Sequence, residues 1–408
     1  MQRSVFDIII LIALFPLYLI SKIIPKDERL YLFGSSLGHH FSDNSKYLFL
    51  YVSENCKKIK PLFISKNKAV VDFILERGAN AAYLYSFRGI MSALRAKKVF
   101  LSHSSEDIYP ALLGGAEKIQ LWHGTPLRMI GYDADWKAPD RKAKIKNLFR
   151  RLFYAVFPYL YSSSDFDKIV VSSEHVCESF KSAFNIGDEK IVCIGQPRND
   201  CLFESYNLNS KFHDSSKIED MISDAIYLIS YLPTHRKPSP TTIVDLMRNY
   251  RFDVIEFNSM LKKADTLLVV KPHFLELGSV NEYLKNLSNI KVYDETDPYP
   301  LMRKTDILIT DYSSVFFDFL LLNKPLIFAP FDYEEYRQNN ADFYYDYQQV
   351  TPGPKCNNWD EVKREILRLI ELFNNDKIDS YASERERVKK MFNKYDDCFA
   401  EKIVKELF

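Results

Sequence analysis

The fold of this chain is decided by one stretch of sequence, Asp306-Ile-Leu-Ile-Thr-Asp-Tyr-Ser-Ser-Val-Phe-Phe-Asp-Phe-Leu-Leu-Leu-Asn-Lys-Pro-Leu-Ile-Phe-Ala-Pro330. It begins with a short apolar run, Ile307–Thr310, and a second apolar run follows Pro325. Between the runs, Ser313 and Ser314 stand where a helix would begin, so the pattern predicts a strand, a helix and a parallel strand. A helix N-terminus presents free backbone N–H groups and partial positive charge, and this βαβ unit therefore predicts a phosphate site.

Apolar runs and helical segments alternate along most of the chain. Two series of strand-like runs stand on either side of a polar, serine-rich segment, 204–223, which we interpret as a connection between domains. The first series is Leu30–Gly34, Pro61–Ile64, Lys98–Leu101, Lys118–Trp122, Lys168–Val171 and Lys190–Ile194, and the second is Ala225–Tyr231, Thr266–Lys271, Ile290–Tyr293, Asp306–Thr310 and Pro325–Phe328. This alternation predicts an α/β protein with two Rossmann-like domains that face a cleft and bind ligands at the carboxyl ends of their strands. The predicted boundaries are 1–26 for an N-terminal helix, 27–205 and 224–385 for the two domains, and 386–408 for a C-terminal helix.

Length and composition narrow the class of protein. At 408 residues the chain exceeds one comfortable core, which favours two domains. The net charge of +1 gives no global field for nucleic acid, so no nucleic-acid partner is expected. The six cysteines show no metal-binding spacing and are expected to be reduced thiols. We expect no metal and no cofactor.

The first 26 residues contain an apolar segment, Val5–Ile24. Twenty helical residues would be about 30 Å long, close to the hydrocarbon thickness of a bilayer. A signal peptide is disfavoured because no small-residue cleavage site follows. A buried core helix is the alternative, but we expect a membrane-associating helix, spanning or half-inserted. The basic residues after it would keep the protein body at the cytoplasmic face of the membrane.

A second segment with a membrane-binding pattern runs from Arg141 to Tyr161. Its apolar residues recur at helical spacing, and basic residues occupy other positions without an acidic neighbour. Such a helix is typical of peripheral attachment to an anionic membrane surface. A domain-packing helix with a solvated basic face is the alternative. The residues expected to touch the membrane are Lys144, Phe149, Arg150, Arg151 and Phe153.

His123 is the first candidate for chemistry, because it follows an apolar run and precedes Gly124. A histidine at a strand end is often structural. However, a neutral imidazole with an ordinary pKa of about 6.5 can accept a proton from a hydroxyl near neutral pH. Gly124 would permit close approach of a ligand. We therefore expect His123 to be a catalytic base.

Two motifs in the second half also follow strands. In Pro233-Thr-His-Arg236, Arg236 could bind a phosphate with two of its N–H groups. His235 could have a role there too, and the alternative is that it only faces solvent. In Lys271-Pro-His273, His273 could stabilise charge on a departing phosphate.

Ser313 and Ser314 are either phosphate ligands or helix caps. Asp318 lies one turn beyond Ser314 on the same helix face. It is expected to hold a ribose hydroxyl or to orient its neighbours.

Together these residues resemble the teichoic-acid CDP-glycerol glycerophosphotransferase family. The order and spacing of the matching motifs cover most of the chain from about residue 34 onward. The motifs are Gln120-Leu-Trp-His-Gly-Thr-Pro-Leu127, Gly195-Gln-Pro-Arg-Asn-Asp200, Pro233-Thr-His-Arg236, Lys271-Pro-His273, Thr310-Asp-Tyr-Ser-Ser-Val-Phe-Phe-Asp318, Phe343-Tyr-Tyr-Asp-Tyr347 and Pro352-Gly-Pro354.

The resemblance implies a GT-B fold and transfer of glycerol phosphate from CDP-glycerol to a hydroxyl of a lipid-linked or polymeric acceptor, with release of CMP. It also implies attachment to the cytoplasmic membrane through amphipathic helices. His123 and His273 would be catalytic. The donor-binding residues would be Thr234, Arg236, His273, Ser313, Ser314 and Asp318, and the acceptor-side residues Asp43, Asn44, Gly124 and Thr125.

One departure keeps alternatives open. The family's Arg-Gly before the Phe-Tyr-x-Asp-Tyr run is replaced by Ala341-Asp342. A CDP-ribitol or other CDP-polyol donor is therefore an alternative, as is a GT-B sugar transferase or epimerase that uses a UDP-sugar. A catalytically silent membrane adaptor is the alternative from another class. The acceptor, the number of units added and the oligomeric state are not predicted.

Overall fold

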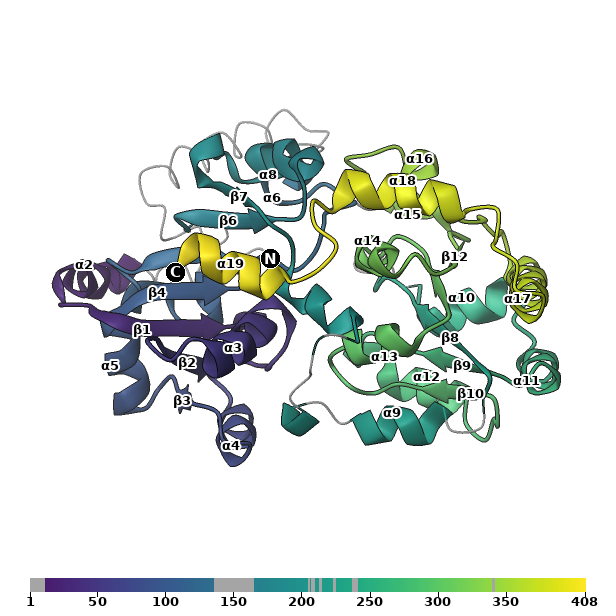
Figure 1. The fold of residues 1–408 in the computed structure, drawn as a ribbon, viewed down its shortest axis with the longest axis horizontal. Coiled ribbons are helices and arrows are strands. Elements are labelled where there is room, and N and C mark those ends of the chain that lie inside the picture. The colour runs from purple at the N-terminus through teal and green to yellow at the C-terminus, as the bar shows by residue number, and fades with distance from the viewer. Residues whose placement is uncertain are drawn as a thin grey trace. The chain divides into compact units, whose positions relative to one another are not determined.

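The structure is a computed structural model, and the chain in it divides into two compact units. Unit 1 consists of Met1–His123, Ile130–Asp200 and Lys394–Phe408, and unit 2 of Gly124–Met129 and Cys201–Asn393. Each unit contains one sheet with helices packed on it (Figure 1). The residues described are 12–135, 165–204, 206, 210–212, 215–222, 225–236, 241–339 and 342–408.

Unit 1 is built on a seven-stranded sheet in the order β3-β2-β1-β4-β5-β6-β7. All neighbouring strands run parallel. The strand order reverses between β1 and β4, and ligands of open α/β sheets bind beyond the carboxyl ends of the strands at such a point. The strands are β1 (Asp27–Gly34), β2 (Lys60–Ser65), β3 (Ala81–Tyr83), β4 (Ala96–Leu101), β5 (Glu117–Gln120), β6 (Lys168–Val171) and β7 (Ile191–Cys193).

An aromatic core holds unit 1 together. Phe33 from β1, Phe63 from β2 and Phe100 from β4 are fully buried. They meet Phe49 from α3, whose ring centroid lies 5.5 Å from that of Phe33. The helices of this unit are α2 (Phe15–Ile23), α3 (Asp43–Asn55), α4 (Lys68–Glu76), α5 (Phe87–Arg95), α6 (Gly131–Asp135), α8 (Cys177–Phe184) and α19 (Phe399–Leu407).

The end of the chain returns to unit 1 as α19, which lies beside β4 in Figure 1. The Asp200 carboxylate accepts the backbone N–H groups of Phe399 and Ala400 at 2.8 and 2.9 Å, which satisfies the start of the helix. At its end, the ring of Phe408 packs 5.2 Å from that of Phe100. The segment predicted as one helix, 386–408, is therefore divided between α18 (Ala382–Phe392) of unit 2 and α19.

Unit 2 has a five-stranded parallel sheet in the order β10-β9-β8-β11-β12. The opening stretch of sequence supplies its β11, which is buried along its whole length. The strands are β8 (Tyr227–Leu232), β9 (Thr266–Val270), β10 (Ile290–Val292), β11 (Ile307–Thr310) and β12 (Leu326–Phe328). The prediction of an α/β fold with two parallel sheets is thus confirmed.

The helices of unit 2 cover this sheet around the buried Trp359, whose ring lies 5.0 Å from that of Tyr231. One helix, α9 (Ser215–Ile222), lies inside the segment that we interpreted as a connection. The others are α10 (Ile243–Asn249), α11 (Val254–Lys263), α12 (Leu277–Tyr283), α13 (Tyr299–Lys304), α14 (Val315–Phe319), α15 (Tyr333–Asn339), α16 (Tyr347–Val350), α17 (Trp359–Asn374) and α18 (Ala382–Phe392).

The described part of the N-terminal apolar segment forms α2. One face packs on unit 1, where the Ser21 hydroxyl accepts the Gly114 N–H at 2.9 Å and Tyr18 is buried. The opposite face exposes apolar side chains, of which Ile23 is 80% exposed. No helix among the described residues combines the length and the apolar character needed to cross a bilayer. The predicted amphipathic helix 141–161, with Lys144, Phe149, Arg150, Arg151 and Phe153, lies outside the described residues.

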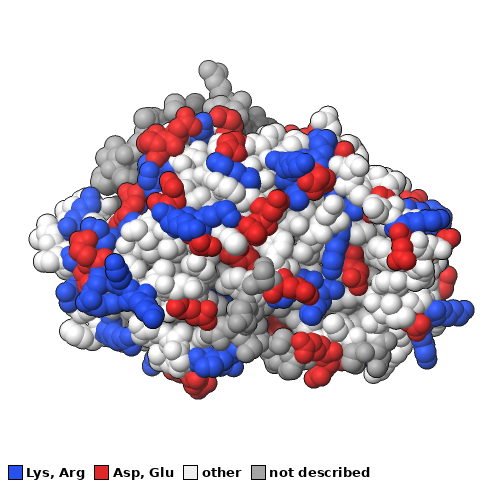
Figure 2. All heavy atoms as spheres, viewed as in Figure 1, with Lys and Arg blue, Asp and Glu red and all other residues white. Residues whose placement is uncertain are grey.

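Acidic and basic side chains are interspersed on the face shown in Figure 2. This distribution agrees with the near balance of 55 basic and 54 acidic residues in the sequence.

Candidate active site

His123 stands on a strained turn after β5. Trp122 has a φ of 57°, a left-handed conformation that bulky residues rarely adopt, and Gly124 has a φ of 141°. The Gln120 side-chain oxygen accepts the Trp122 N–H at 3.0 Å, and Asn44 Nδ2 donates to the Trp122 carbonyl at 2.8 Å. Such strain costs about 1–3 kcal/mol and persists where the surroundings over-determine it, often at functional sites. The direction in which His123 projects is therefore fixed by dedicated contacts.

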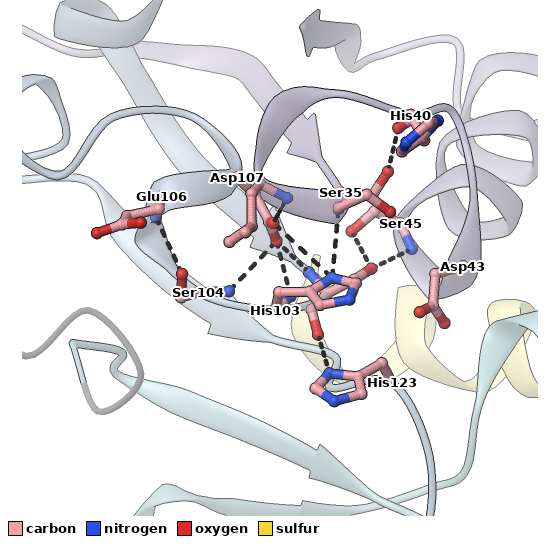
Figure 3. Close-up of polar contacts among 12 residues, drawn as sticks. Ser35, His40, Asp43, Ser45, His103, Ser104, Glu106, Asp107 and His123 are labelled. Atoms are coloured by element: carbon pink, nitrogen blue, oxygen red, sulfur yellow. Dashed lines mark hydrogen bonds and ion pairs between the residues drawn. The ribbon is translucent and has the colours of Figure 1, made fainter. Parts of the chain in front are cut away.

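The His123 ring is held in one tautomer. Its Nδ1 lies 3.1 Å from the carbonyl oxygen of Ser102 (Figure 3). A carbonyl oxygen only accepts hydrogen bonds, so the proton is on Nδ1 and Nε2 keeps its lone pair. Burial, followed by the neighbouring His103, lowers the pKa of His123 to about 4. The ring is therefore neutral near pH 7, which is the state that a general base requires.

His103 is a second imidazole at the same edge of the sheet, and sequence reasoning missed it. Its ring stacks on that of His123, with centroids 4.5 Å apart and planes 10° from parallel (Figure 3). His103 follows β4, the neighbour of β5. Its Nδ1 accepts the backbone N–H of Ser36, which follows β1, at 3.2 Å. The signal that could have revealed it is the run Ser102-His-Ser-Ser105 directly after a predicted strand.

Asp107 organises the loop that carries these contacts. Its buried carboxylate accepts the N–H groups of Leu37, Ser102 and His103 at 2.7 to 2.8 Å. Burial raises the pKa of Asp107 to about 6, and these backbone hydrogen bonds oppose the rise. The Ser102 carbonyl that fixes the His123 tautomer is thus placed by a buried acid.

Asn44 corrects one prediction. We expected it on the acceptor side, but its side chain is fully buried and committed to the protein. Asn44 Nδ2 donates to the Gln196 side-chain oxygen as well as to Trp122, and its Oδ1 accepts the Arg198 N–H at 3.2 Å. Asp43, also predicted on the acceptor side, pairs with the Arg198 guanidinium at 2.7 Å. Two residues of the Gly195–Asp200 motif therefore brace the His123 turn.

Gly124 and Thr125 begin the segment Gly124–Met129, which belongs to unit 2. Thr125 is buried, and the segment then pairs with the Phe343 motif: the Met129 N–H donates to the Asp342 carbonyl at 2.7 Å. This pairing brings together two motifs that lie far apart in the sequence.

A second pair of imidazoles lies at the carboxyl edge of the sheet of unit 2. His235 follows β8, His273 follows the neighbouring β9, and their rings stack with centroids 4.2 Å apart. His235 Nδ1 lies 2.9 Å from a carboxylate oxygen of Glu276. The other Glu276 oxygen accepts the Ile243 N–H at 2.7 Å. His235 therefore does not simply face solvent, and Glu276, which sequence reasoning missed, orients it.

Thr234 stands beside this pair. Its backbone N–H donates to Asp311 at 2.8 Å. Its hydroxyl is buried and has no hydrogen-bond partner among the described residues, so one buried polar group at this edge is left unsatisfied.

Arg236 corrects a second prediction. Its guanidinium is buried, with Nε 2.7 Å from Asp332 and Nη2 2.7 Å from Asp311. The remaining nitrogen, Nη1, donates to the Thr234 carbonyl at 2.6 Å. All three nitrogens are thus engaged, and Arg236 ties the ends of β8 and β11 together instead of gripping a phosphate from the open edge.

Ser313 and Ser314 follow β11, next to β8 in the sheet. Ser314 is the N-cap of α14, but its side chain makes no cap hydrogen bond, which disfavours the cap interpretation. Asp318 is buried and accepts the Tyr299 hydroxyl at 2.6 Å. The expected contact of Asp318 with a ribose is therefore corrected to the other role we considered, that of orienting its neighbours.

Comparisons with known proteins agree with these motifs. The sequence model of the CDP-Glycerol:Poly(glycerophosphate) glycerophosphotransferase family matches residues 16–408. A teichoic acid poly(glycerol phosphate) polymerase of Bacillus spizizenii is 28% identical over 367 residues, 88% of each chain. A teichoic acid glycerol-phosphate transferase of Staphylococcus aureus is 26% identical and covers 88% of this chain and 89% of its own. The solved structure of the wall teichoic acid polymerase TagF has a TM-score of 0.71 at 22% identity, over 98% of this chain and 95% of that one. At this identity the likeness shows the fold.

Proposed function

Because the chain belongs to the CDP-Glycerol:Poly(glycerophosphate) glycerophosphotransferase family, we propose that it transfers glycerol phosphate from CDP-glycerol to a hydroxyl of a lipid-linked or polymeric acceptor. The product would be a teichoic-acid-like polymer of the cell surface. The observation that supports this proposal most is the hydrogen bond from His123 Nδ1 to the Ser102 carbonyl, which leaves Nε2 as a base.

The proposed reaction is a single displacement. His123 Nε2 takes the proton of the acceptor hydroxyl, whose oxygen forms a bond to the β-phosphorus of CDP-glycerol. The bond from that phosphorus to the bridging oxygen breaks, and the oxygen leaves on CMP. Most of the rate enhancement would come from positioning and from stabilisation of charge, as in other phosphoryl transfers. The proposal invokes no cofactor.

Unit 2 would hold the diphosphate of the donor. His273 and the hydroxyls of Thr234, Ser313 and Ser314 follow three adjacent strands, β9, β8 and β11. His235 would share this task, because its ring stacks on that of His273 and is oriented by the Glu276 carboxylate at Nδ1. Arg236 and Asp318 would act indirectly, by holding these strand ends.

The test is incubation of the full chain with CDP-glycerol or CDP-ribitol and a membrane lipid extract, followed by mass measurement of the products. We expect an added mass of one or more glycerol phosphate units and release of CMP. If the acceptor gained mass only from CDP-ribitol, the donor would be CDP-ribitol and not CDP-glycerol. Absence of CMP with both donors, or release of UDP from UDP-sugars instead, would contradict the proposal.

We also propose attachment to the cytoplasmic face of the membrane. The outer face of α2 supports this, since it exposes Leu19, Ile20 and Ile23 while its other face packs on the rest of unit 1. Replacing Leu19 and Ile23 by Ser should weaken sedimentation with anionic phospholipid vesicles. If the variant and the wild type bound the vesicles equally, α2 would not contribute to membrane attachment.

A further inference from the structure

A hydrogen-bond donor and a hydrogen-bond acceptor are stacked at the carboxyl edge of unit 1. His123 offers the lone pair of Nε2, as described above. His103 offers the opposite group, because its Nδ1 accepts the Ser36 N–H and its proton is therefore on Nε2. Within the described part of the chain, the hydrogen bonds of both rings are made by Nδ1 and not by Nε2.

The orientation of His103 is maintained at a cost in backbone strain. Ser36 and Leu37 have φ angles of 50° and 58°, in the left-handed region that favours glycine. Their N–H groups are bound by His103 Nδ1 and by the Asp107 carboxylate. The His103 side chain is 31% exposed, so it is not a core residue that merely fills space. A strained loop that fixes a half-exposed ring points to a role for the N–H that the ring presents.

His103 is suited to a neutral N–H contact with an anion. Burial lowers its pKa, which keeps the ring uncharged near pH 7. The Asp107 carboxylate lies 3.8 Å from Nδ1 of His103, on the side of the ring away from Nε2. Asp43 and Arg198, whose charges act on the pKa of His103 in opposite directions, are paired with each other at 2.7 Å. The Nε2–H is thus a directional donor beside a base.

We infer that His103 binds an anionic oxygen of the acceptor's own phosphate group, beside the hydroxyl that His123 deprotonates. This inference rests on the proposed function and deepens it. A ligand that satisfies both rings carries a hydroxyl and a phosphate oxygen a few bonds apart, as the terminal unit of a glycerol phosphate chain does. A hydroxyl with no phosphate nearby satisfies His123 alone. His103 is thereby a specificity-determining residue that selects acceptors ending in a phosphorylated polyol.

Two substitutions separate the N–H of His103 from its ring. His103→Phe keeps an aromatic ring for the stack and removes the donor, whereas His103→Gln keeps a donor amide and removes the ring. Two synthetic acceptors differ in the phosphate only: an alkyl phosphoglycerol and a monoalkyl glycerol ether. The measurement is CMP release from CDP-glycerol with each acceptor, expressed as the ratio of the two kcat/KM values. His175→Phe, an exposed histidine of the same unit, is the matched control.

The wild type should prefer the phosphoglycerol over the glycerol ether. His103→Phe should lower the ratio of the two kcat/KM values by roughly 10- to 100-fold, because the KM for the phosphoglycerol rises. This is the contribution expected of one hydrogen bond to a charged group. His103→Gln should restore much of the ratio, and His175→Phe should leave it unchanged. An unchanged ratio in His103→Phe, or a loss in His103→Gln that exceeds the loss in His103→Phe, would overturn the inference alone. If the wild type released no CMP with the phosphoglycerol and none with the ether, both the proposed function and this inference would be overturned.

Discussion

The two stacked pairs of imidazoles differ in what holds them. In unit 1, His123 donates to a backbone carbonyl and His103 accepts from a backbone N–H, so both rings are fixed as neutral tautomers. In unit 2, His235 Nδ1 lies beside the Glu276 carboxylate, and His273 Nδ1 accepts the backbone N–H of Leu275 at 3.4 Å. The same residue type, at the same edge of two parallel sheets, is thus held by backbone groups alone in unit 1 and by a carboxylate and a backbone group in unit 2. The group at Nδ1 decides whether the Nε2 of a neutral ring presents a lone pair or an N–H.

The largest effect is expected from removal of the neutral imidazole. His123→Ala should lower kcat by roughly 10²–10⁴, the usual contribution of a general base. The control is His175→Ala, an exposed histidine of the same unit, which should keep wild-type turnover. Turnover by His123→Ala at the wild-type rate would assign the base elsewhere.

Removal of the carboxylate from the other pair should have a smaller effect. Glu276→Gln retains the shape of the side chain but weakens the contact with a carboxylate that orients His235. We expect kcat/KM for the donor to fall by roughly 10- to 100-fold, the worth of one hydrogen bond to a charged group. Steady-state kinetics with varied CDP-glycerol would measure it. Glu282→Gln, on the helix α12 that follows Glu276, is exposed and paired with Lys285 and should change little; equal losses in both variants would argue against a dedicated role for Glu276.

The contacts of Asn44 that hold the His123 turn should contribute to the free energy of unfolding. Asn44→Ala leaves the Trp122 carbonyl and the Arg198 N–H without their partner, which should lower the free energy of unfolding by about 2–3 kcal/mol. Denaturant titration followed by circular dichroism measures this. Asn55→Ala, exposed at the end of the same helix, should stay within about 0.5 kcal/mol of the wild type. Equal stability of Asn44→Ala and Asn55→Ala would mean that the brace is dispensable.

The smallest effect concerns the acid side of the pH profile. His123 works only when neutral, and its pKa of about 4 means that it becomes protonated only as the pH falls toward 4. The kcat/KM value should therefore stay nearly constant from pH 8 to about pH 5, where an ordinary imidazole with a pKa of about 6.5 would be mostly protonated. Circular dichroism at each pH controls for unfolding. An acid limb centred near pH 6.5 in a folded protein would contradict this environment of His123.

Most of the fold was predictable because its strands are short apolar runs. The predicted runs at 98–101, 118–122 and 306–310 correspond to β4, β5 and β11. Two elements were missed. The strand β3 has only three residues, and α9 lies in a serine-rich segment where composition resembles a linker. Three residues are too few to show a period, and in α9 the serine-rich composition outweighed the helical pattern in our prediction.

The candidate site was predictable only in part. The position of His123 and His273 at strand ends follows from local sequence, whereas the partners of a side chain do not. Arg236 meets Asp332, which is 96 residues away in the chain, and Asn44 meets Trp122, which is 78 residues away. Only the fold brings such residues together, so the structural roles of Arg236 and Asn44 could not be read from their motifs.

The central claim is that His123 of unit 1 serves proton transfer and His273 of unit 2 serves the donor. Calorimetric titration of CDP-glycerol into the wild type, His123→Ala and His273→Ala tests it most directly. The account predicts that His123→Ala binds the donor within about threefold of the wild type, while His273→Ala binds roughly tenfold or more weakly. Loss of donor binding in His123→Ala together with normal binding in His273→Ala would contradict it.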